Sequence, residues 1–195
     1  MLTIPTLLTW LRIAMIPLFV GVYYFPHDTL AVSTKNIIGM WIFVGAALTD
    51  WLDGYLARKL NQTTPFGTFL DPVADKLMVA AALIVLAKLD RADPFLAFII
   101  IGREITISAL REWLAQVGQH KKVAVSMLGK IKTTAQMIAI SCLLYWQDLW
   151  GLPIAKIGTV ALVIAVALTL WSMFYYLRAA WPYVSPDTLP GSDKR

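Results

Sequence analysis

Long apolar runs alternate along the chain with short polar or proline-containing segments. A helix needs roughly 20 apolar residues to cross the hydrocarbon core of a bilayer, and most of these runs have about that length. The pattern predicts six helices, at about residues 5–25, 36–60, 69–88, 94–117, 130–147 and 154–180. No internal repeat or second domain is visible. We therefore expect one six-helix membrane catalytic domain over residues 1–182 and a polar, disordered cytoplasmic tail over residues 183–195.

The second and third predicted helices are joined by the segment NQTTPFGT, residues 61–68. We expect Gly67 to let this loop turn tightly, because glycine adopts backbone conformations that other residues avoid. Pro72 then falls in the first turn of the third helix, where a missing N–H is tolerated. The loop is short, so the two helices it joins stay close together.

Composition supports an integral membrane protein. Of the 195 residues, 58% are hydrophobic and 15% are charged, whereas soluble domains are about 45–50% apolar and about 25% charged. The first apolar run contains Arg12 and follows no basic region, so it resembles a spanning helix more than a cleaved signal. The single cysteine, Cys142, excludes an intrachain disulfide and a cysteine-based metal site.

The distribution of positive charge predicts an orientation. Six spans put both termini on one side, and lysine and arginine accumulate on the cytoplasmic side. Nine basic residues fall on the side of the termini: Arg58, Lys59, Lys121, Lys122, Lys130, Lys132, Arg178, Lys194 and Arg195. Four fall on the other: Lys35, Lys88, Arg91 and Lys156. The net charge of +5 therefore indicates a cytoplasmic face rather than a nucleic-acid site.

Four aspartates lie close together in this apolar chain, at the ends of the second and third predicted helices. Asp50 and Asp53 are spaced i, i+3, and Asp71 and Asp75 are spaced i, i+4, so each pair lies on one face of its helix. The short loop lets all four carboxylates point into one space. Helix caps and ion pairs are the simpler explanation, but an N-cap before Pro72 accounts for Asp71 and leaves the other three unexplained.

Metal binding accounts for all four carboxylates. Bare charges near hydrocarbon cost several kcal/mol each, and Arg58 and Lys76 cannot neutralise four anions. Oxygen ligands without histidine or cysteine favour Mg²⁺ or Mn²⁺. Four carboxylates suit two ions, and a two-metal site is typical of phosphoryl transfer. Beside Asp50 and Asp53, Gly54 and Ala57 leave room for a ligand, and Arg58 could hold a diphosphate with its forked donors.

These residues resemble the full motif of the CDP-alcohol phosphotransferase family, which reads here Asp50-x2-Asp53-Gly54-x2-Ala57-Arg58-x8-Gly67-x3-Asp71-x3-Asp75. The segment IPTLLTWLRI, with Thr9 and Arg12, is similar to the N-terminal Pro-x-x-Leu-Thr-x-x-Arg segment of that family. Eight fixed positions with fixed gaps make the motif specific. The resemblance extends over about residues 4–178.

The resemblance implies an all-α fold of six transmembrane helices, a homodimer, membrane lipids as neighbours and two divalent cations. It implies that Asp50, Asp53 and Asp71 bind metal and that Asp75 binds metal and acts as the general base. The CDP-lipid donor would contact Thr9, Gly54, Ala57, Arg58 and Gly67. Within the family, REITISALREWL and VAVSMLGKIKTTAQM are most similar to bacterial inner-membrane members that use CDP-diacylglycerol and glycerol 3-phosphate.

An acceptor carrying a phosphate predicts a basic pocket. Arg103 and Arg111 lie eight residues apart, close to one face of the fourth predicted helix, and Lys130 and Lys132 open the fifth. An arginine inside an apolar helix needs a partner or a polar cavity, and Glu104 could be the partner of Arg103 or orient it. The resemblance assigns the acceptor phosphate to these four basic residues as well.

Three alternatives remain open at the level of sequence. A cardiolipin or phosphatidylinositol phosphate synthase would share the motif and differ in the acceptor. An Mg²⁺-dependent intramembrane prenyltransferase also uses aspartate pairs, but its two motifs usually lie far apart in a longer chain. A cation transporter would place its carboxylates near the middle of the bilayer rather than at helix ends.

Overall fold

The structure of the chain is a computed structural model that describes residues 4–26, 28–60, 65–116 and 127–181. Within these ranges the side chains of residues 4, 5, 57, 58, 60, 65, 66, 68, 115, 127–131 and 179 are not described. The predicted tail, residues 183–195, lies outside the described residues.

The described residues form six α-helices and no strand, so the prediction of an all-α fold is confirmed. Each predicted helix has its counterpart. The helices are α1 (Ile4–Val22), α2 (Val32–Leu60), α3 (Pro65–Lys88), α4 (Pro94–Gln116), α5 (Met127–Tyr145) and α6 (Ile154–Ala180).

The prediction for the start of the third helix was wrong. Helix α3 begins at Pro65, and Gly67 belongs to the helix rather than to a tight turn. Proline suits the first position of a helix, because its ring fixes φ near the helical value and its missing N–H has no partner there. Pro72 consequently lies inside α3, where it leaves the carbonyl of residue 68 without its usual helical donor.

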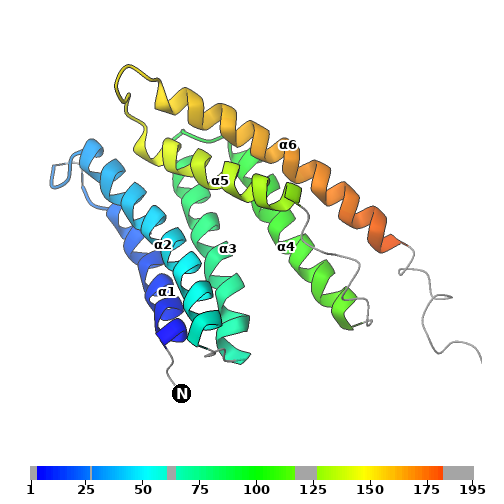
Figure 1. Cartoon of the computed structure of the whole chain (residues 1–195). Helices are drawn as coiled ribbons and strands as arrows, with labels where there is room; N and C mark the ends of the chain where they lie inside the picture. Colours follow the sequence, from blue (N-terminus) through cyan, green and yellow to red (C-terminus); the bar gives the residue numbers. More distant parts are fainter. Residues whose placement is uncertain (1–3, 27, 61–64, 117–126, 182–195) are drawn as a thin grey trace, which may run out of the picture.

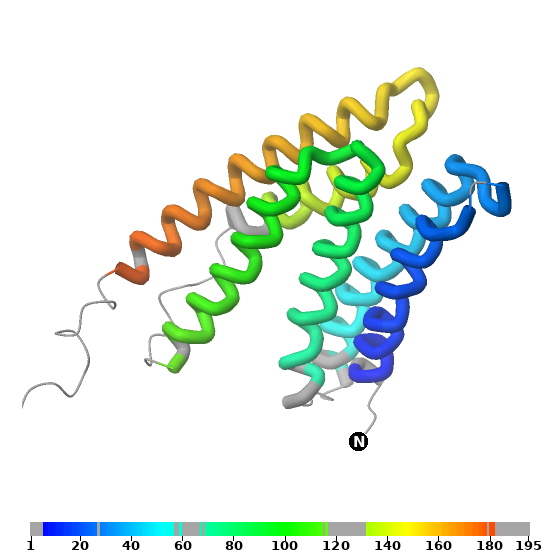
Figure 2. Tube along the Cα trace, turned by 180° about the vertical axis from the view of Figure 1, so that it is seen from behind, coloured from blue at the N-terminus to red at the C-terminus, as the bar shows by residue number. Residues whose placement is uncertain are grey.

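Two groups of helices make up the fold. Helices α1, α2 and α3 stand side by side, whereas α6 runs obliquely with α5 packed along it, and α4 contacts both α3 and α6 (Figures 1 and 2). Because the helices alternate in direction, the start of α1, the end of α2 and the start of α3 lie at one end of the molecule (Figure 1). This arrangement brings the four aspartates to the same end as Thr9 and Arg12.

One apolar core joins all six helices. Each helix contributes a fully or almost fully buried side chain, namely Phe19, Phe43, Leu83, Ile100, Ile140 and Leu162. Burying a side chain of this size contributes about 1.5–3 kcal/mol. The core therefore fixes the relative positions of the helix ends that carry the polar residues.

The turn between α3 and α4 is held by a buried arginine. Arg91 donates hydrogen bonds to the carbonyl oxygens of Leu143 and Leu144, at 3.3 and 3.1 Å, and to Oδ1 of Asn36 at 2.8 Å. The last carbonyls of a helix lack partners within it. Arg91 supplies such partners to the end of α5 and ties that end to the start of α2.

The outer surface is strongly apolar. Large side chains such as Trp41 on α2, Phe98 on α4 and Trp171 on α6 are exposed, and contiguous apolar surface suits lipid better than water. Among the described residues, Val32–Leu56 and Ile154–Arg178 are long and apolar enough to cross a membrane. Passage of all six helices through the bilayer stays a prediction.

Candidate active site

Arg12 is the centre of the acidic end of the molecule. Its side chain is 1% exposed, and its Nη1 lies 2.7 Å from Oδ1 of Asp50. Its Nη2 forms a second, short ion pair with Oδ2 of Asp53. The i, i+3 spacing on α2 lets both carboxylates face the same guanidinium on α1. A cation inside an apolar helix is thus matched by the anions of its neighbour.

The carboxylates of α3 join this group. Thr9, one turn before Arg12 on α1, donates a hydrogen bond to Oδ1 of Asp71 at 2.5 Å. Asp53 is close enough to Asp50 and Asp71 to interact with them electrostatically, and Asp75 interacts with Asp50 in the same way. These interactions link the four carboxylates in pairs at one end of the molecule.

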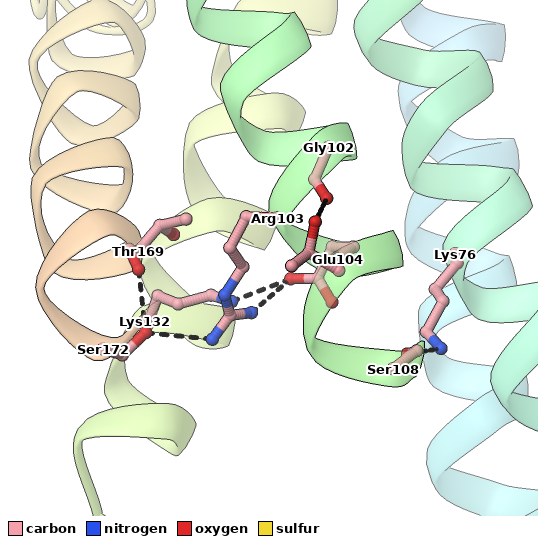
Figure 3. Close-up of polar contacts among 9 residues, drawn as sticks. Lys76, Gly102, Arg103, Glu104, Ser108, Lys132, Thr169 and Ser172 are labelled. Atoms are coloured by element: carbon pink, nitrogen blue, oxygen red, sulfur yellow. Dashed lines mark hydrogen bonds and ion pairs between the residues drawn. The ribbon is translucent and has the colours of Figure 1, made fainter. Parts of the chain in front are cut away.

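A second polar cluster joins α4, α5 and α6. Oε1 of Glu104 lies 2.7 Å from Nη1 of Arg103 and 2.8 Å from Nζ of Lys132 (Figure 3). Nη2 of Arg103 donates to Oγ of Ser172 at 2.9 Å, and Ser172 donates to the carbonyl oxygen of Thr169 at 2.9 Å. Both cations are buried, so the bridging carboxylate stabilises charges that water does not reach.

One cavity connects the two clusters. It has a volume of about 280 Å³, and its lining includes Asp75 and Lys76 of α3, Arg103 and Arg111 of α4, Lys132 of α5 and Tyr176 of α6. Lys76 donates a short hydrogen bond to Oγ of Ser108 across the α3–α4 contact. The guanidinium of Arg111 lies 5.6 Å from the ring centre of Tyr176. An acidic group and several cations therefore face one space.

Another hollow lies between α2 and α5, towards the other end of the molecule. It has a volume of about 390 Å³ and is lined by apolar side chains such as Ile37 and Trp41, together with Ser141, Cys142 and Tyr145. Among the described residues, no charged side chain lines it. Phosphoryl chemistry needs charged or metal-binding groups, so the cavity beside Asp75 is the candidate active site.

A model of the CDP-alcohol phosphatidyltransferase family matches residues 2–172. The chain belongs to this family. Both this family and the apolar helices indicate a membrane protein.

Curated relatives in this phosphatidyltransferase family cover almost the whole chain. A protein of Pectobacterium atrosepticum is 51% identical over 179 residues, which is 91% of this chain and 94% of the relative. A protein of Sodalis glossinidius is 50% identical over 181 residues, or 92% of this chain and 95% of the relative. A protein of Shigella flexneri is 48% identical over 179 residues, with coverage of 91% and 94%. All three are named CDP-diacylglycerol–glycerol-3-phosphate 3-phosphatidyltransferase.

The described part of this phosphatidyltransferase includes most of the predicted site residues. Asp50, Asp53, Asp71 and Asp75 lie in the acidic cluster, while Arg103, Arg111 and Lys132 line the cavity. Gly54 lies on α2 beside Asp53, and Gly67 is buried in α3. The side chains of Ala57, Arg58 and Lys130 lie outside the described residues.

Several contacts of the site were not predicted from the sequence, among them those of Arg12 and the bond between Glu104 and Lys132. The sequence places Arg12 in the N-terminal segment that is similar to the family's, and an arginine in an apolar run also indicates a buried partner, in the same way as Arg103 does. Glu104 was expected beside Arg103, but its bond to Lys132 was not, because that lysine comes from α5, 28 positions away. Only the packing of α4 against its neighbours reveals this contact.

The acidic cluster consists of carboxylates, which are the donor type that divalent cations such as Mg²⁺ prefer. Two of its carboxylates, those of Asp50 and Asp53, contact the positive charge of the Arg12 guanidinium, and hard oxygen ligands suit Mg²⁺ and Mn²⁺. In the described part of the chain, no three acidic, histidine or cysteine side chains are grouped closely enough to hold a metal ion as they stand. The cluster thus has the ligand types of a metal site, with Arg12 and Thr9 holding three of the four carboxylates.

Proposed function

We propose that the chain transfers the phosphatidyl group of CDP-diacylglycerol to glycerol 3-phosphate, giving phosphatidylglycerophosphate and CMP. The names and coverage of the relatives support this activity, and so does the family. The structural observation that carries the proposal is the common cavity of Asp75 and the basic residues Arg103, Arg111 and Lys132. A proton acceptor then stands opposite cations suited to a phosphorylated alcohol.

Asp50, Asp53, Asp71 and Asp75 would hold two divalent cations, Mg²⁺ or Mn²⁺. When bound, such ions neutralise a diphosphate and stabilise the charge on the leaving group. Thr9, Gly54, Ala57, Arg58 and Gly67 would bind the CDP-lipid. The hydrogen bond from Thr9 to Asp71 supports a link between these two sets of residues.

Asp75 acts as the general base in this proposal. Its carboxylate takes the proton from the acceptor hydroxyl, whose oxygen attacks the phosphorus that bears diacylglycerol. A new P–O bond forms to the acceptor, and the P–O bond to CMP breaks. Arg103, Arg111, Lys130 and Lys132 hold the acceptor's phosphate, so its hydroxyl is directed at Asp75.

The enzyme works as a homodimer in the bacterial inner membrane, with six spanning helices and its active site facing the cytoplasm. The distribution of lysine and arginine supports this orientation. The acyl chains of the donor remain in the bilayer while its diphosphate reaches the acidic end of α2 and α3.

An acceptor assay tests this function. Purified protein with Mg²⁺ and CDP-diacylglycerol is expected to release CMP when glycerol 3-phosphate is added, and not with glycerol or inositol. Substitution of Arg103 by Gln should raise the KM for glycerol 3-phosphate about tenfold or more, since a charge-assisted contact is worth about 1.5–3 kcal/mol. Release of CMP with inositol phosphate or phosphatidylglycerol but not with glycerol 3-phosphate would assign a different synthase.

A further inference from the structure

The basic cluster consists of Arg103, Arg111 and Lys132 on one cavity, and Glu104 bridges the first and the last of them. Arg103 and Lys132 both contact the same oxygen, Oε1, at 2.7 and 2.8 Å. The side chains of the two cations are 5% and 3% exposed, whereas that of Glu104 is 26% exposed. The carboxylate is therefore the accessible member of a group whose cations are buried.

The cluster has donors that Glu104 does not use. Nε of Arg103 is buried and has no hydrogen-bond partner in the described part of the chain. A buried donor without an acceptor costs about 1–3 kcal/mol, which is a reason to expect a ligand in this cavity. Arg111 lies over Tyr176 on the same cavity wall and forms no ion pair with any described residue. The single negative charge of Glu104 therefore does not balance the three positive charges of Arg103, Arg111 and Lys132.

We propose that Glu104 is a specificity-determining residue. Its carboxylate stands in for the acceptor's phosphate in the resting enzyme, and the phosphate displaces it from Arg103 and Lys132. This inference rests on the proposed function for the identity of the acceptor. The displacement itself is a property of the basic cluster and any phosphate that enters it.

The charges and contacts explain the direction of this exchange. A phosphate offers three strong acceptor oxygens and a charge near −2, against the single oxygen that Glu104 uses. Among the described residues, Nε of Arg103 has no acceptor and Arg111 forms no ion pair, so both can bind the additional oxygens. Glu104 is partly exposed, so its carboxylate can turn to the open side of the cavity and regain water.

Selectivity against neutral alcohols follows from the same exchange. A neutral alcohol carries no negative charge that could replace the carboxylate beside the two buried cations. Glu104 therefore stays bound to Arg103 and Lys132, and the alcohol cannot enter the cavity. Leaving two buried cations unpaired would cost several kcal/mol. The carboxylate thus makes entry depend on a negatively charged acceptor.

Titration calorimetry with inorganic phosphate tests the proposal. It uses the full chain in detergent, with EDTA present and without CDP-lipid, so that neither metal nor donor contributes. Glu104→Gln keeps the size of the side chain and removes the competing charge. We expect it to bind phosphate about tenfold more tightly than the wild type, which corresponds to about 1.4 kcal/mol. The KM of this variant for glycerol 3-phosphate should also be lower than that of the wild type.

Glu112→Gln is the matched control, because it removes a charge from an exposed position on the same helix. It should bind phosphate as the wild type does. Glu104→Asp keeps the charge and should lie closer to the wild type than Glu104→Gln does. Unchanged or weaker phosphate binding by Glu104→Gln would overturn the proposal, because a residue that only orients Arg103 and Lys132 is needed for anion binding. Equal gains in the Gln and Asp variants would also overturn it.

A second measurement does not depend on any variant. In an experimental structure of the wild-type protein with inorganic phosphate, the anion should contact Arg103 and Lys132, and Glu104 should have left both. Phosphate bound while Glu104 still bridges the two cations would refute the displacement. Failure of glycerol 3-phosphate turnover would refute the proposed function alone, since the phosphate titration requires no reaction.

Discussion

At the scale of single residues, Arg12 has an unusual position between two carboxylates of another helix. Asp53 is 3% exposed, and its ion pair with Arg12 stabilises the carboxylate where hydration is largely absent. A divalent cation at the acidic cluster would offer the same compensation. A metal ion in the proposed site would therefore stabilise the same carboxylates as the guanidinium does.

Substituting Arg12 by Gln should make the stability of the protein depend on metal. Removing one partner of a buried ion pair costs about 3–5 kcal/mol, so the midpoint of thermal unfolding should fall in EDTA. Saturating Mg²⁺ should restore much of the loss. Arg178→Gln, at an exposed position of α6, is the control and should change the midpoint little in either buffer. An equal loss with and without Mg²⁺ would argue against a metal beside Asp50 and Asp53.

Substituting Asp75 by Asn should remove the proposed base. We expect kcat to fall by about 10²–10⁴-fold at saturating Mg²⁺, the usual contribution of general base catalysis. The unfolding midpoint should stay near that of the wild type, because Asn keeps the shape of the side chain. Asp90→Asn, in the exposed turn after α3, is expected to leave kcat unchanged. Turnover by Asp75→Asn at the wild-type rate would exclude the general-base role.

The sequence predicted which residues gather at the site better than it predicted their partners. The regular spacing of Asp50 and Asp53, and of Asp71 and Asp75, follows from helical periodicity alone. The contact between Arg12 and Asp50 joins residues 38 positions apart, and the contact between Thr9 and Asp71 joins residues 62 positions apart. Such contacts depend on how α1 packs against α2 and α3, and no local pattern specifies that packing.

At the scale of elements, helix existence was easier to predict than helix ends. The apolar runs identified each of the helices in the described part of the chain, because burial in a membrane or core requires long runs of apolar residues. The start of α3 was missed because Pro65 and Gly67 are typical of turns as well as of helix beginnings. The local sequence is compatible with both a turn and a helix at Pro65, and the structure shows the helix.

The contact between α5 and α6 depends on a glycine. A Cβ added to Gly158 would lie 2.9 Å from Cγ of Leu143 and 3.0 Å from Cβ of Cys142. Gly158→Ala should therefore destabilise the protein by about 1–3 kcal/mol, as overpacked cores do, seen as a lower unfolding midpoint. Gly21→Ala meets no atom within 4 Å and serves as the control. An unchanged midpoint for Gly158→Ala would mean that the two helices separate without loss.

At the scale of the whole molecule, the polar residues are distributed unevenly between the two ends. The aspartates, Thr9 and Arg12 lie at the end that holds the start of α1, whereas Arg91 and the α5–α6 turn lie at the other end (Figure 1). In the proposed orientation the first end faces the cytoplasm, where soluble glycerol 3-phosphate is available.

Cysteine labelling tests this orientation. In a Cys142→Ser background, Trp150→Cys places a thiol at a position that is 95% exposed in the α5–α6 turn. A membrane-impermeant maleimide should label it in intact spheroplasts. Glu112→Cys, at an exposed position near the end of α4, should react only after lysis. The reverse pattern would place the active site outside the cytoplasm.

The ion pairs of Arg12 also bear on how the chain enters the membrane. Arg12 precedes Asp50 and Asp53 in the chain, so the counter-ion is synthesised before the carboxylates that need it. When the acidic end of α2 leaves the ribosome, α1 already carries the compensating charge. The first hairpin can therefore insert as a nearly neutral unit at that end, before any later helix exists.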